Sequence, residues 1–188
     1  HLGWVLGGYR FTRYSGTPLE SNLVPDKSID RDALAREGEA VFLARDLINT
    51  PANDMGPEAL EQAIRKLGRT HKATVTVVKG EALLKENFPM IHAVGRASVD
   101  APRLVDLKWG NAKHPKVTLV GKGVVFDSGG LNIKPGNSMA LMKKDMGGAA
   151  NTIALAGMIM AANLPVRLRL LVPAVENAIA GNAFRPGD

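Results

Sequence analysis

One stretch decides the fold of this 188-residue chain: Val120-Gly-Lys-Gly-Val-Val-Phe-Asp-Ser-Gly-Gly-Leu-Asn-Ile-Lys-Pro-Gly136, continued by Met142-Lys-Lys-Asp-Met-Gly-Gly-Ala-Ala-Asn151. The apolar run at its start is typical of a buried strand, and the glycines and proline that follow are typical of a loop. The Gly-Gly-Ala-Ala segment then opens an apolar run that predicts a helix. A strand followed by a loop and a helix indicates an α/β fold, in which ligands bind at the carboxyl ends of the strands.

Two helices are predicted on the N-terminal side of this stretch. Apolar residues recur near helical spacing from Ile29 to Ile48, and this helix should end at the Asn49-Thr-Pro51 segment, because the residue before a proline disfavours helical geometry. Pro57 suits the first turn of a second helix that runs to about Thr70. Residues Leu2 to Phe11 look like the end of another helix.

Strand patterns recur along the rest of the chain. We expect strands over residues 73–78, 103–109, 117–125 and 166–172, and a buried helix over residues 147–163. The alternation of strands and helices predicts an α/β protein whose mixed, mostly parallel sheet is sandwiched between helices in three layers.

The composition is that of a globular protein with a sizeable core. Hydrophobic residues make up 45% of the chain and charged residues 22%. The chain contains no cysteine, which excludes disulfides, cysteine-ligated zinc and thiol nucleophiles. The longest apolar stretch, Met158 to Leu164, is too short to span a bilayer, and the first residues lack the pattern of a signal peptide.

The basic excess is the next feature to interpret. Lysine and arginine number 24 against 18 acidic residues, which gives a net charge of +6 and permits contact with nucleic acid. The basic residues are scattered, with at most short pairs such as Lys143-Lys144, and aromatic residues make up only 5%. Stacking platforms for single strands are therefore scarce, and nucleic-acid binding is not indicated.

The glycines of the central stretch fit neither of two nucleotide-binding patterns. A phosphate cradle places Gly-Lys-Ser/Thr at the start of a helix, whereas Lys122 is followed by Gly123 and by more strand. A dinucleotide fingerprint needs Gly-x-Gly-x-x-Gly at a helix start, whereas Gly121-Lys-Gly123 is followed by Val-Val-Phe. We therefore expect no nucleotide cofactor.

The charged residues of the same stretch are compatible with two arrangements. Asp127 and Asp145 are separated by a loop that can fold them together, and their oxygens suit a divalent cation. Lys122 would join them only as a neutral amine, so burial and the cation itself would have to favour loss of its proton. In the alternative, the side chains form ion pairs such as Lys122–Asp127 and Lys134–Asp145. The residues alone leave both arrangements open.

The central stretch closely resembles the leucine aminopeptidase (cytosol aminopeptidase) family, which are two-metal exopeptidases that remove N-terminal residues. The runs Val-Gly-Lys-Gly, Phe-Asp-Ser-Gly-Gly, Lys-Pro and Met-Lys-Lys-Asp-Met-Gly-Gly-Ala-Ala carry this resemblance. Further stretches agree with it: Asn49-Thr-Pro-Ala-Asn-Asp54, and Pro173-Ala-Val-Glu-Asn177 with Arg185-Pro-Gly-Asp188. The similarity extends over essentially the whole chain, and it implies the front part of a metallopeptidase catalytic domain.

The resemblance implies roles for five side chains. Lys122, Asp127 and Asp145 fall on metal-ligand positions, with Asp127 bridging two divalent ions, zinc or manganese. Lys134 falls on the catalytic lysine and would stabilise the oxyanion of the tetrahedral intermediate. Met142 falls on a wall of the pocket that receives the N-terminal side chain of the substrate. The two ions would bind the substrate and activate water.

The chain also departs from the family pattern. Nothing in it represents the N-terminal domain of the family, and the later motif Asn-Thr-Asp-Ala-Glu-Gly-Arg, which supplies an Asp and a Glu ligand and a catalytic Arg, is absent. We therefore expect a piece of a longer protein, in which residues 1–27 are the tail of an interdomain helix with its loop. Residues 28–188 would be the N-terminal part of the incomplete, three-layer catalytic domain. This chain alone should be a poor catalyst or none.

For the complete protein the resemblance implies a cytoplasmic, leucine-type aminopeptidase that acts on peptides with a free N-terminus. It further implies a homo-hexamer and no association with a membrane. Two other functions stay open from the sequence: a non-catalytic structural or interaction fragment, and a basic nucleic-acid-binding module.

Other polar residues receive less specific interpretations. The histidines are expected to be structural or surface residues: His1, His71, His92 and His114. Asn49, Asn53 and Asp54 are expected to be turn and cap residues. Glu176 and Asn177 follow a predicted strand, where they would either support the site or belong to a loop.

Overall fold

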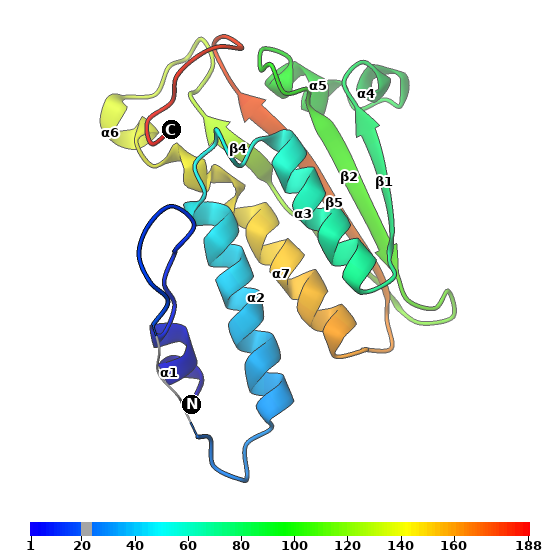
Figure 1. Cartoon of the computed structure of the whole chain (residues 1–188). Coiled ribbons are helices and arrows are strands. Elements are labelled where there is room, and N and C mark those ends of the chain that lie inside the picture. Colours follow the sequence, from blue (N-terminus) through cyan, green and yellow to red (C-terminus); the bar gives the residue numbers. More distant parts are fainter. Residues whose placement is uncertain (20–23) are drawn as a thin grey trace.

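A mixed sheet of five strands forms the centre of the molecule in this computed structural model, which describes residues 1–19 and 24–188 (Figure 1). Its strands are β1 (Thr74–Lys79), β2 (Arg103–Trp109), β3 (Lys116–Val120), β4 (Gly123–Asp127) and β5 (Arg167–Asn177). The order is β1-β2-β5-β3, and β4 also pairs with β5, beyond the end of β3. The pairs β1/β2 and β2/β5 are antiparallel, whereas β3 and β4 both run parallel to β5.

These pairings mean that β2 alone runs against the direction of the other strands. The predicted α/β class with a mixed sheet flanked by helices is confirmed. The parallel strands β4 and β5 end side by side, at Asp127 and Asn177. Side chains from two distant parts of the sequence are therefore brought to one edge of the sheet.

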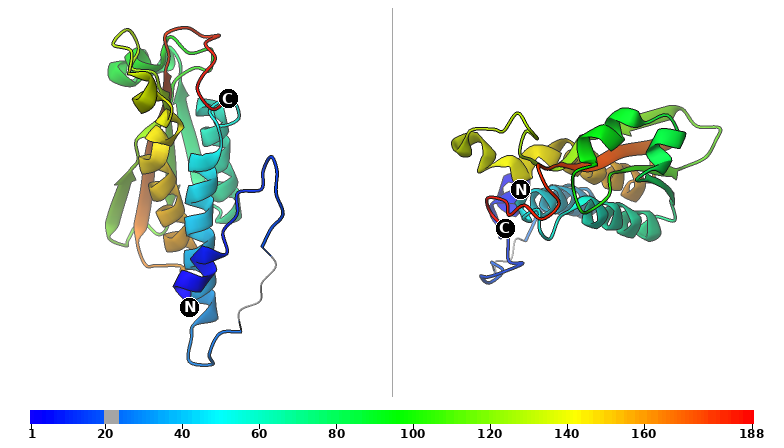
Figure 2. Two further views of the ribbon diagram at one scale, coloured as in Figure 1. Left: turned by 90° about the vertical axis from the view of Figure 1, so that its left-hand side faces the viewer. Right: turned by 90° about the horizontal axis from the view of Figure 1, so that it is seen from above.

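The helices lie on both faces of the sheet. They are α1 (Leu2–Gly7), α2 (Arg31–Asn49), α3 (Pro57–Thr70), α4 (Ala82–Lys85), α5 (Pro89–Gly95), α6 (Gly136–Met139), the 3-10 helix η1 (Met142–Met146) and α7 (Gly147–Ala161). The long helices α2, α3 and α7 share one face, and α5 lies on the other face near the carboxyl end of β5 (Figure 2). At Gly95 of α5 an added Cβ would lie 3.1 Å from the Cβ of Val175, so the two backbones approach closely.

The ends of the long helices have local causes. The Asp30 side chain accepts a hydrogen bond from the Ala33 amide at 2.9 Å and so caps α2. The helix stops before Pro51, as the sequence predicts. Pro57 occupies the first turn of α3, and α7 begins at Gly147, also as predicted.

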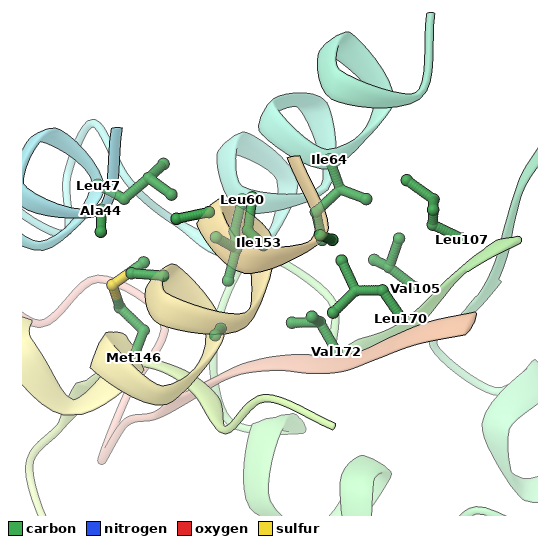
Figure 3. Packing of buried hydrophobic residues seen from close by; sticks show 14 of the residues in the cluster. Ala44, Leu47, Leu60, Ile64, Val105, Leu107, Met146, Ile153, Leu170 and Val172 are labelled. Carbon is green, nitrogen blue, oxygen red and sulfur yellow. The ribbon is translucent and has the colours of Figure 1, made fainter. Parts of the chain in front are cut away.

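The core lies between the sheet and the three long helices (Figure 3). Alternate residues of β2 and β5 point into it, and those of β5 are Leu168, Leu170 and Val172, each at most 1% exposed. The opposing helices contribute Leu60, Ile64 and Ile153, and η1 contributes Met146, all fully buried. Small residues of α7 such as Ala149, Ala150 and Ala156 let this helix lie close against its neighbours.

Several elements differ from the sequence-based expectations, among them α6 and η1, which lie where a loop was expected. The single strand expected over residues 117–125 is divided into β3 and β4, because the regular strand geometry is interrupted at Gly121 and Lys122. β5 continues to Asn177 instead of ending near residue 172. The short helices α4 and α5 were not expected, since helices of four and seven residues depend on tertiary packing and leave little periodic signal.

None of the helices found in residues 1–19 and 24–188 combines the length and the apolar character needed to cross a membrane.

Candidate metal centre

The candidate centre lies at the carboxyl ends of β4 and β5, where the loop after β4, η1 and the C-terminal segment gather (Figure 1). Lys122 immediately precedes β4, and Asp127 is its last residue. Lys134 lies in the glycine-rich loop that follows, and Asp145 lies in η1. The fold therefore brings Lys122, Asp127, Lys134 and Asp145 toward one end of the sheet.

Four charged side chains form two ion pairs at this end of the sheet. The Lys122 Nζ lies 2.7 Å from Asp145 Oδ1, and the Lys134 Nζ lies 3.1 Å from Asp127 Oδ2. The sequence-based alternative paired Lys122 with Asp127 and Lys134 with Asp145, and that assignment of partners is wrong. Lys122 precedes β4 beside the junction of η1 and α7, whereas Asp127 ends the strand, next to the loop that carries Lys134.

Asp127 is held by other groups in addition to its ion-pair partner Lys134. Its Oδ1 accepts hydrogen bonds from the Gly129 amide at 2.9 Å and from the Asn177 Nδ2 at 2.8 Å. Partial burial raises the pKa of Asp127, but the hydrogen bonds from Lys134, Gly129 and Asn177 outweigh burial and hold that pKa below its ordinary value. Asp127 is therefore an anion at neutral pH, in a fixed orientation.

Asp145 has one oxygen without a partner. Its Oδ1 binds Lys122, but its Oδ2 is buried and accepts no hydrogen bond from any group that the structure describes. A buried carboxylate oxygen without a partner is costly, and such groups in native structures call for an explanation such as a bound ion.

The loop that carries Lys134 is built by two left-handed glycines. Gly129 and Gly130 have φ values of +90° and +64°, which disfavour residues with a Cβ. An added Cβ at Gly129 would lie 2.2 Å from the Asn132 carbonyl oxygen. The turn returns the chain so that the Lys134 amide donates to the Ser128 carbonyl at 2.9 Å. The tight turn thus places Lys134 next to Asp127.

The segment after β5 is fastened to the same end of the sheet by a polar network. Glu176 is 6% exposed, and its carboxylate accepts from Arg185 Nη1 and from Ser98 Oγ, both at 2.8 Å. Arg185 also lies 2.9 Å from Asp188 Oδ2. Sequence analysis left Glu176 and Asn177 open: Asn177 contacts Asp127 of the candidate centre, whereas the contacts of Glu176 are with Arg185 and Ser98. The opposite charges of Glu176 and Arg185 in two family-like stretches were the signal that could have linked them.

The remaining residues singled out from the sequence are distributed over α2, η1, the turn after α2 and the surface. Asn49 is the last residue of α2, its carbonyl accepts from Lys143 Nζ at 2.8 Å, and this bond ties η1 to α2. Met142 is the half-buried first residue of η1. Asn53 and Asp54 occupy the turn between α2 and α3. The histidines lie at a helix end, in the pair with Glu81, or at the surface: His71, His92, His1 and His114.

Comparison with known proteins decides the family. The sequence profile described as "Cytosol aminopeptidase family, catalytic domain" matches residues 42–188, which is most of the chain. This chain belongs to the cytosol aminopeptidase family. The predicted resemblance is thereby confirmed.

Relatives in the cytosol aminopeptidase family share both sequence and fold with this chain. A probable cytosol aminopeptidase from Syntrophotalea carbinolica is 40% identical over 203 residues, which cover 99% of this chain and 41% of the relative. The crystal structure of cytosol aminopeptidase from Coxiella burnetii has 52% identity and a TM-score of 0.91, covering 100% of this chain and 41% of that one. The bottromycin maturation enzyme BotP in complex with Mn has 40% identity and a TM-score of 0.84, with the same coverage.

The chain thus spans about two fifths of the length of these cytosol aminopeptidase relatives. Residues 1–19 and 24–188 contain no group of three His, Cys, Asp or Glu side chains that could hold a metal ion.

One observation of this structure indicates that the donor groups of the candidate centre fit a divalent cation. Asp145 Oδ2 is buried and unpartnered, and it belongs to the carboxylate whose other oxygen binds Lys122. A cation at this point would satisfy the free oxygen, and it would replace the ammonium proton of Lys122 as the balancing positive charge. Oxygen and amine donors are compatible with zinc and with manganese.

Proposed function

We propose that this chain is the front part of the catalytic domain of a metal-dependent aminopeptidase, with two divalent ions held by Lys122, Asp127 and Asp145. The observation that supports this most directly is the buried Asp145 oxygen without a partner, beside Lys122. Family membership and a relative solved with Mn agree with it. Divalent ions in such a site polarise the peptide carbonyl and lower the pKa of water so that hydroxide is available at neutral pH.

Asp127 is the residue best suited to contact both ions. Its carboxylate is anionic, and its two oxygens face different neighbours, Asn177 and Gly129 on one side and Lys134 on the other. The hydrogen bonds from Asn177 and Gly129 fix the carboxylate plane before any ion binds. Such support from outside the ligand shell raises affinity because less ordering is needed on binding.

Lys134 is the proposed oxyanion-stabilising group. Its ammonium lies at the edge of the centre, 3.1 Å from Asp127 Oδ2, and its side chain is 31% exposed. A cation held in place before the reaction stabilises negative charge that develops on the carbonyl oxygen, because no reorganisation is needed at that moment. The ion pair with Asp127 keeps the Lys134 ammonium oriented toward the centre in the absence of substrate.

Met142 is the proposed contact for the side chain of the substrate's first residue. It lies three residues before Asp145 in η1, so a group held near Asp145 would be within reach of it. Large apolar side chains are exposed nearby in the sequence and in the loop after β4: Leu131, Ile133 and Leu141. An apolar N-terminal residue, leucine among them, is the chemistry that this surrounding favours.

For the complete protein we propose peptide substrates with a free N-terminus, a cytoplasmic location and a homo-hexameric assembly. We also propose that residues 1–27 belong to the connection with a preceding domain. In the structure α1 packs on α2, where the Tyr9 hydroxyl donates to Asp46 at 2.7 Å and Arg45 Nη1 donates to the Leu6 carbonyl at 3.1 Å. Residues 1–9 are therefore attached to α2 by specific contacts.

The test is hydrolysis of a leucine anilide with added Mn²⁺ or Zn²⁺ by the product of the complete open reading frame and by the 188-residue chain. Activity of the complete product that is lost on Lys134→Ala and on Asp145→Asn supports the proposal. Lys144→Ala is the matched control, because Lys144 is an exposed neighbour in η1 with no role in the centre. A complete product that folds, binds no Mn²⁺ and hydrolyses nothing contradicts the proposal and favours a non-catalytic fragment.

A further inference from the structure

Lys143 of η1 is a half-buried charged residue to which the proposed chemistry gives no role. Its Nζ donates to the carbonyl oxygen of Asn49 at 2.8 Å. Asn49 is the last residue of α2, so this bond joins two elements whose residues are 94 positions apart in the sequence. Lys144, the next residue of η1, is exposed. Of these two adjacent lysines, Lys143 is therefore the one whose position calls for an explanation.

The carbonyl of Asn49 takes a donor from η1 because α2 ends there. In a helix that continued, this carbonyl would accept a hydrogen bond from the amide of Asn53. The helix stops before Pro51, and the Asn53 amide donates instead to Asp188 Oδ1 at 3.3 Å. The carboxyl end of a helix also carries a partial negative charge, which favours an ammonium group. Lys143 therefore completes the end of α2 with a charge-assisted hydrogen bond.

The side chains of η1 lie on three faces, because a 3-10 helix has three residues per turn. Lys143 and Met146 share the face that packs against α2, and Met146 is fully buried in the core (Figure 3). Met142 and Asp145 share a second face, and the exposed Lys144 lies on the third. A rotation of η1 about its axis would therefore turn the face of Asp145 and the face that contacts α2 together.

The two ends of η1 are held in different ways. Beyond its carboxyl end the Ala149 amide donates to the Lys122 carbonyl at 2.9 Å, which joins the start of α7 to the residue before β4. Before its amino end Leu141 is 61% exposed, so packing of the preceding loop holds this end little. The bond from Lys143 fixes the amino end to α2. A 3-10 helix of five residues has weak internal hydrogen bonds, so its orientation depends on such contacts.

We propose that Lys143 is a positioning residue that fixes the orientation of η1. Through η1 it sets the direction of Asp145 toward the metal and of Met142 toward the first side chain of the substrate. This inference rests on the proposed function as a metal-dependent aminopeptidase. Small displacements of a ligand or a contact group lower affinity and rate, because the productive geometry is narrow. Support for a ligand from outside the ligand shell commonly changes metal affinity about 10- to 100-fold.

The experiment compares the complete protein with its Lys143→Met and Lys144→Met variants. Methionine keeps an unbranched side chain and removes the charge and the donor, so both variants change the net charge equally. Isothermal titration calorimetry measures the affinity for Mn²⁺, and kcat/KM is measured for leucine and alanine anilides. Lys143→Arg is the rescue variant, because a guanidinium also donates hydrogen bonds to a carbonyl. Urea unfolding establishes that each variant is folded at the assay temperature.

The proposal predicts that Lys143→Met binds Mn²⁺ about tenfold more weakly and that its preference for leucine over alanine falls about threefold or more. Lys143→Arg should recover most of the Mn²⁺ affinity, and Lys144→Met should match the original protein. Unchanged Mn²⁺ affinity in Lys143→Met, an unchanged preference for leucine, or an equal loss in Lys144→Met would overturn the role of Lys143 and leave the metal centre standing. An original protein that binds no Mn²⁺ would overturn the proposed centre, and this role with it.

Discussion

Asp145 holds its two carboxylate oxygens in different environments, one in an ion pair and one buried without a partner. Replacement by asparagine removes the negative charge and leaves nearly the same shape. We expect Asp145→Asn to weaken Mn²⁺ binding at least about tenfold, because an anionic ligand is lost. Isothermal titration calorimetry measures this directly. Asp106→Asn removes a carboxylate at the other end of the sheet, and a similar loss of Mn²⁺ affinity in that variant would contradict the assignment.

Asn177 acts on the centre through Asp127, to which it donates at 2.8 Å, and is therefore a positioning residue. Asn177→Ala should reduce metal affinity or activity about 10- to 100-fold, as loss of a hydrogen bond to a ligand does in other metal sites. In the complete protein kcat should fall more than KM rises, because substrate contacts are unchanged. Asn182→Ala, at an exposed position of the same segment, is the control. An unchanged kcat in Asn177→Ala would show that Asp127 needs no such support.

Asp127 also makes stability depend on pH. Its pKa in the folded chain is lowered, so its contribution is fully present above its ordinary unfolded value of about 4 and is lost as pH falls through the folded value. Without metal, the unfolding free energy of Asp127→Asn should lie about 1–3 kcal/mol below that of the original chain at pH 7. Urea unfolding in EDTA at pH 7 and near pH 3 measures this. A difference in unfolding free energy between the two chains that stays constant or widens in acid would contradict the hydrogen bonds assigned to Asp127.

At the scale of elements, the break between β3 and β4 is set by Gly121. An added Cβ would lie 2.1 Å from Thr152 Oγ1 and 2.7 Å from the Ala149 Cα, so the strand approaches α7 closely only without a side chain. Gly121→Ala should destabilise the chain by about 1–3 kcal/mol, the usual cost of overpacking. Gly136→Ala is the matched control, because nothing lies within 4 Å of its added Cβ. Equal unfolding midpoints in the two variants would show that α7 can move aside.

The break between β3 and β4 also shows a feature of the fold that local sequence patterns do not predict. Alternating and apolar patterns predicted β1, β2, α2, α3 and α7 well, because each pattern reports the burial of one face. The pattern across 117–125 is continuous, and only the close contact of Gly121 with α7 divides it. The exchanged partners of Lys122 and Lys134 have the same origin, since ion pairing depends on which loops meet, and no local pattern records that.

At the scale of the molecule, the two ends of the sheet have different characters. The carboxyl ends of β4 and β5 carry the candidate centre and exposed apolar side chains, whereas basic side chains cluster at the opposite end of the sheet. The motifs of the central stretch were sufficient to predict the family and the α/β class. The clustering of Lys108, Lys116, Arg167 and Arg169 was not predictable, because these residues meet only through the strand register.

The most direct test of the proposed centre is an anomalous-difference map from crystals of the complete protein grown with Mn²⁺. The account predicts a peak about 2.0–2.3 Å from oxygens of Asp127 and Asp145, with Lys122 turned to the ion as a neutral amine. In that state the Lys122–Asp145 ion pair is replaced by shared ligation, and the buried Asp145 oxygen gains its partner. Crystals that hold Mn²⁺ elsewhere, with the two ion pairs intact and the Asp145 oxygen still without a partner, would contradict it.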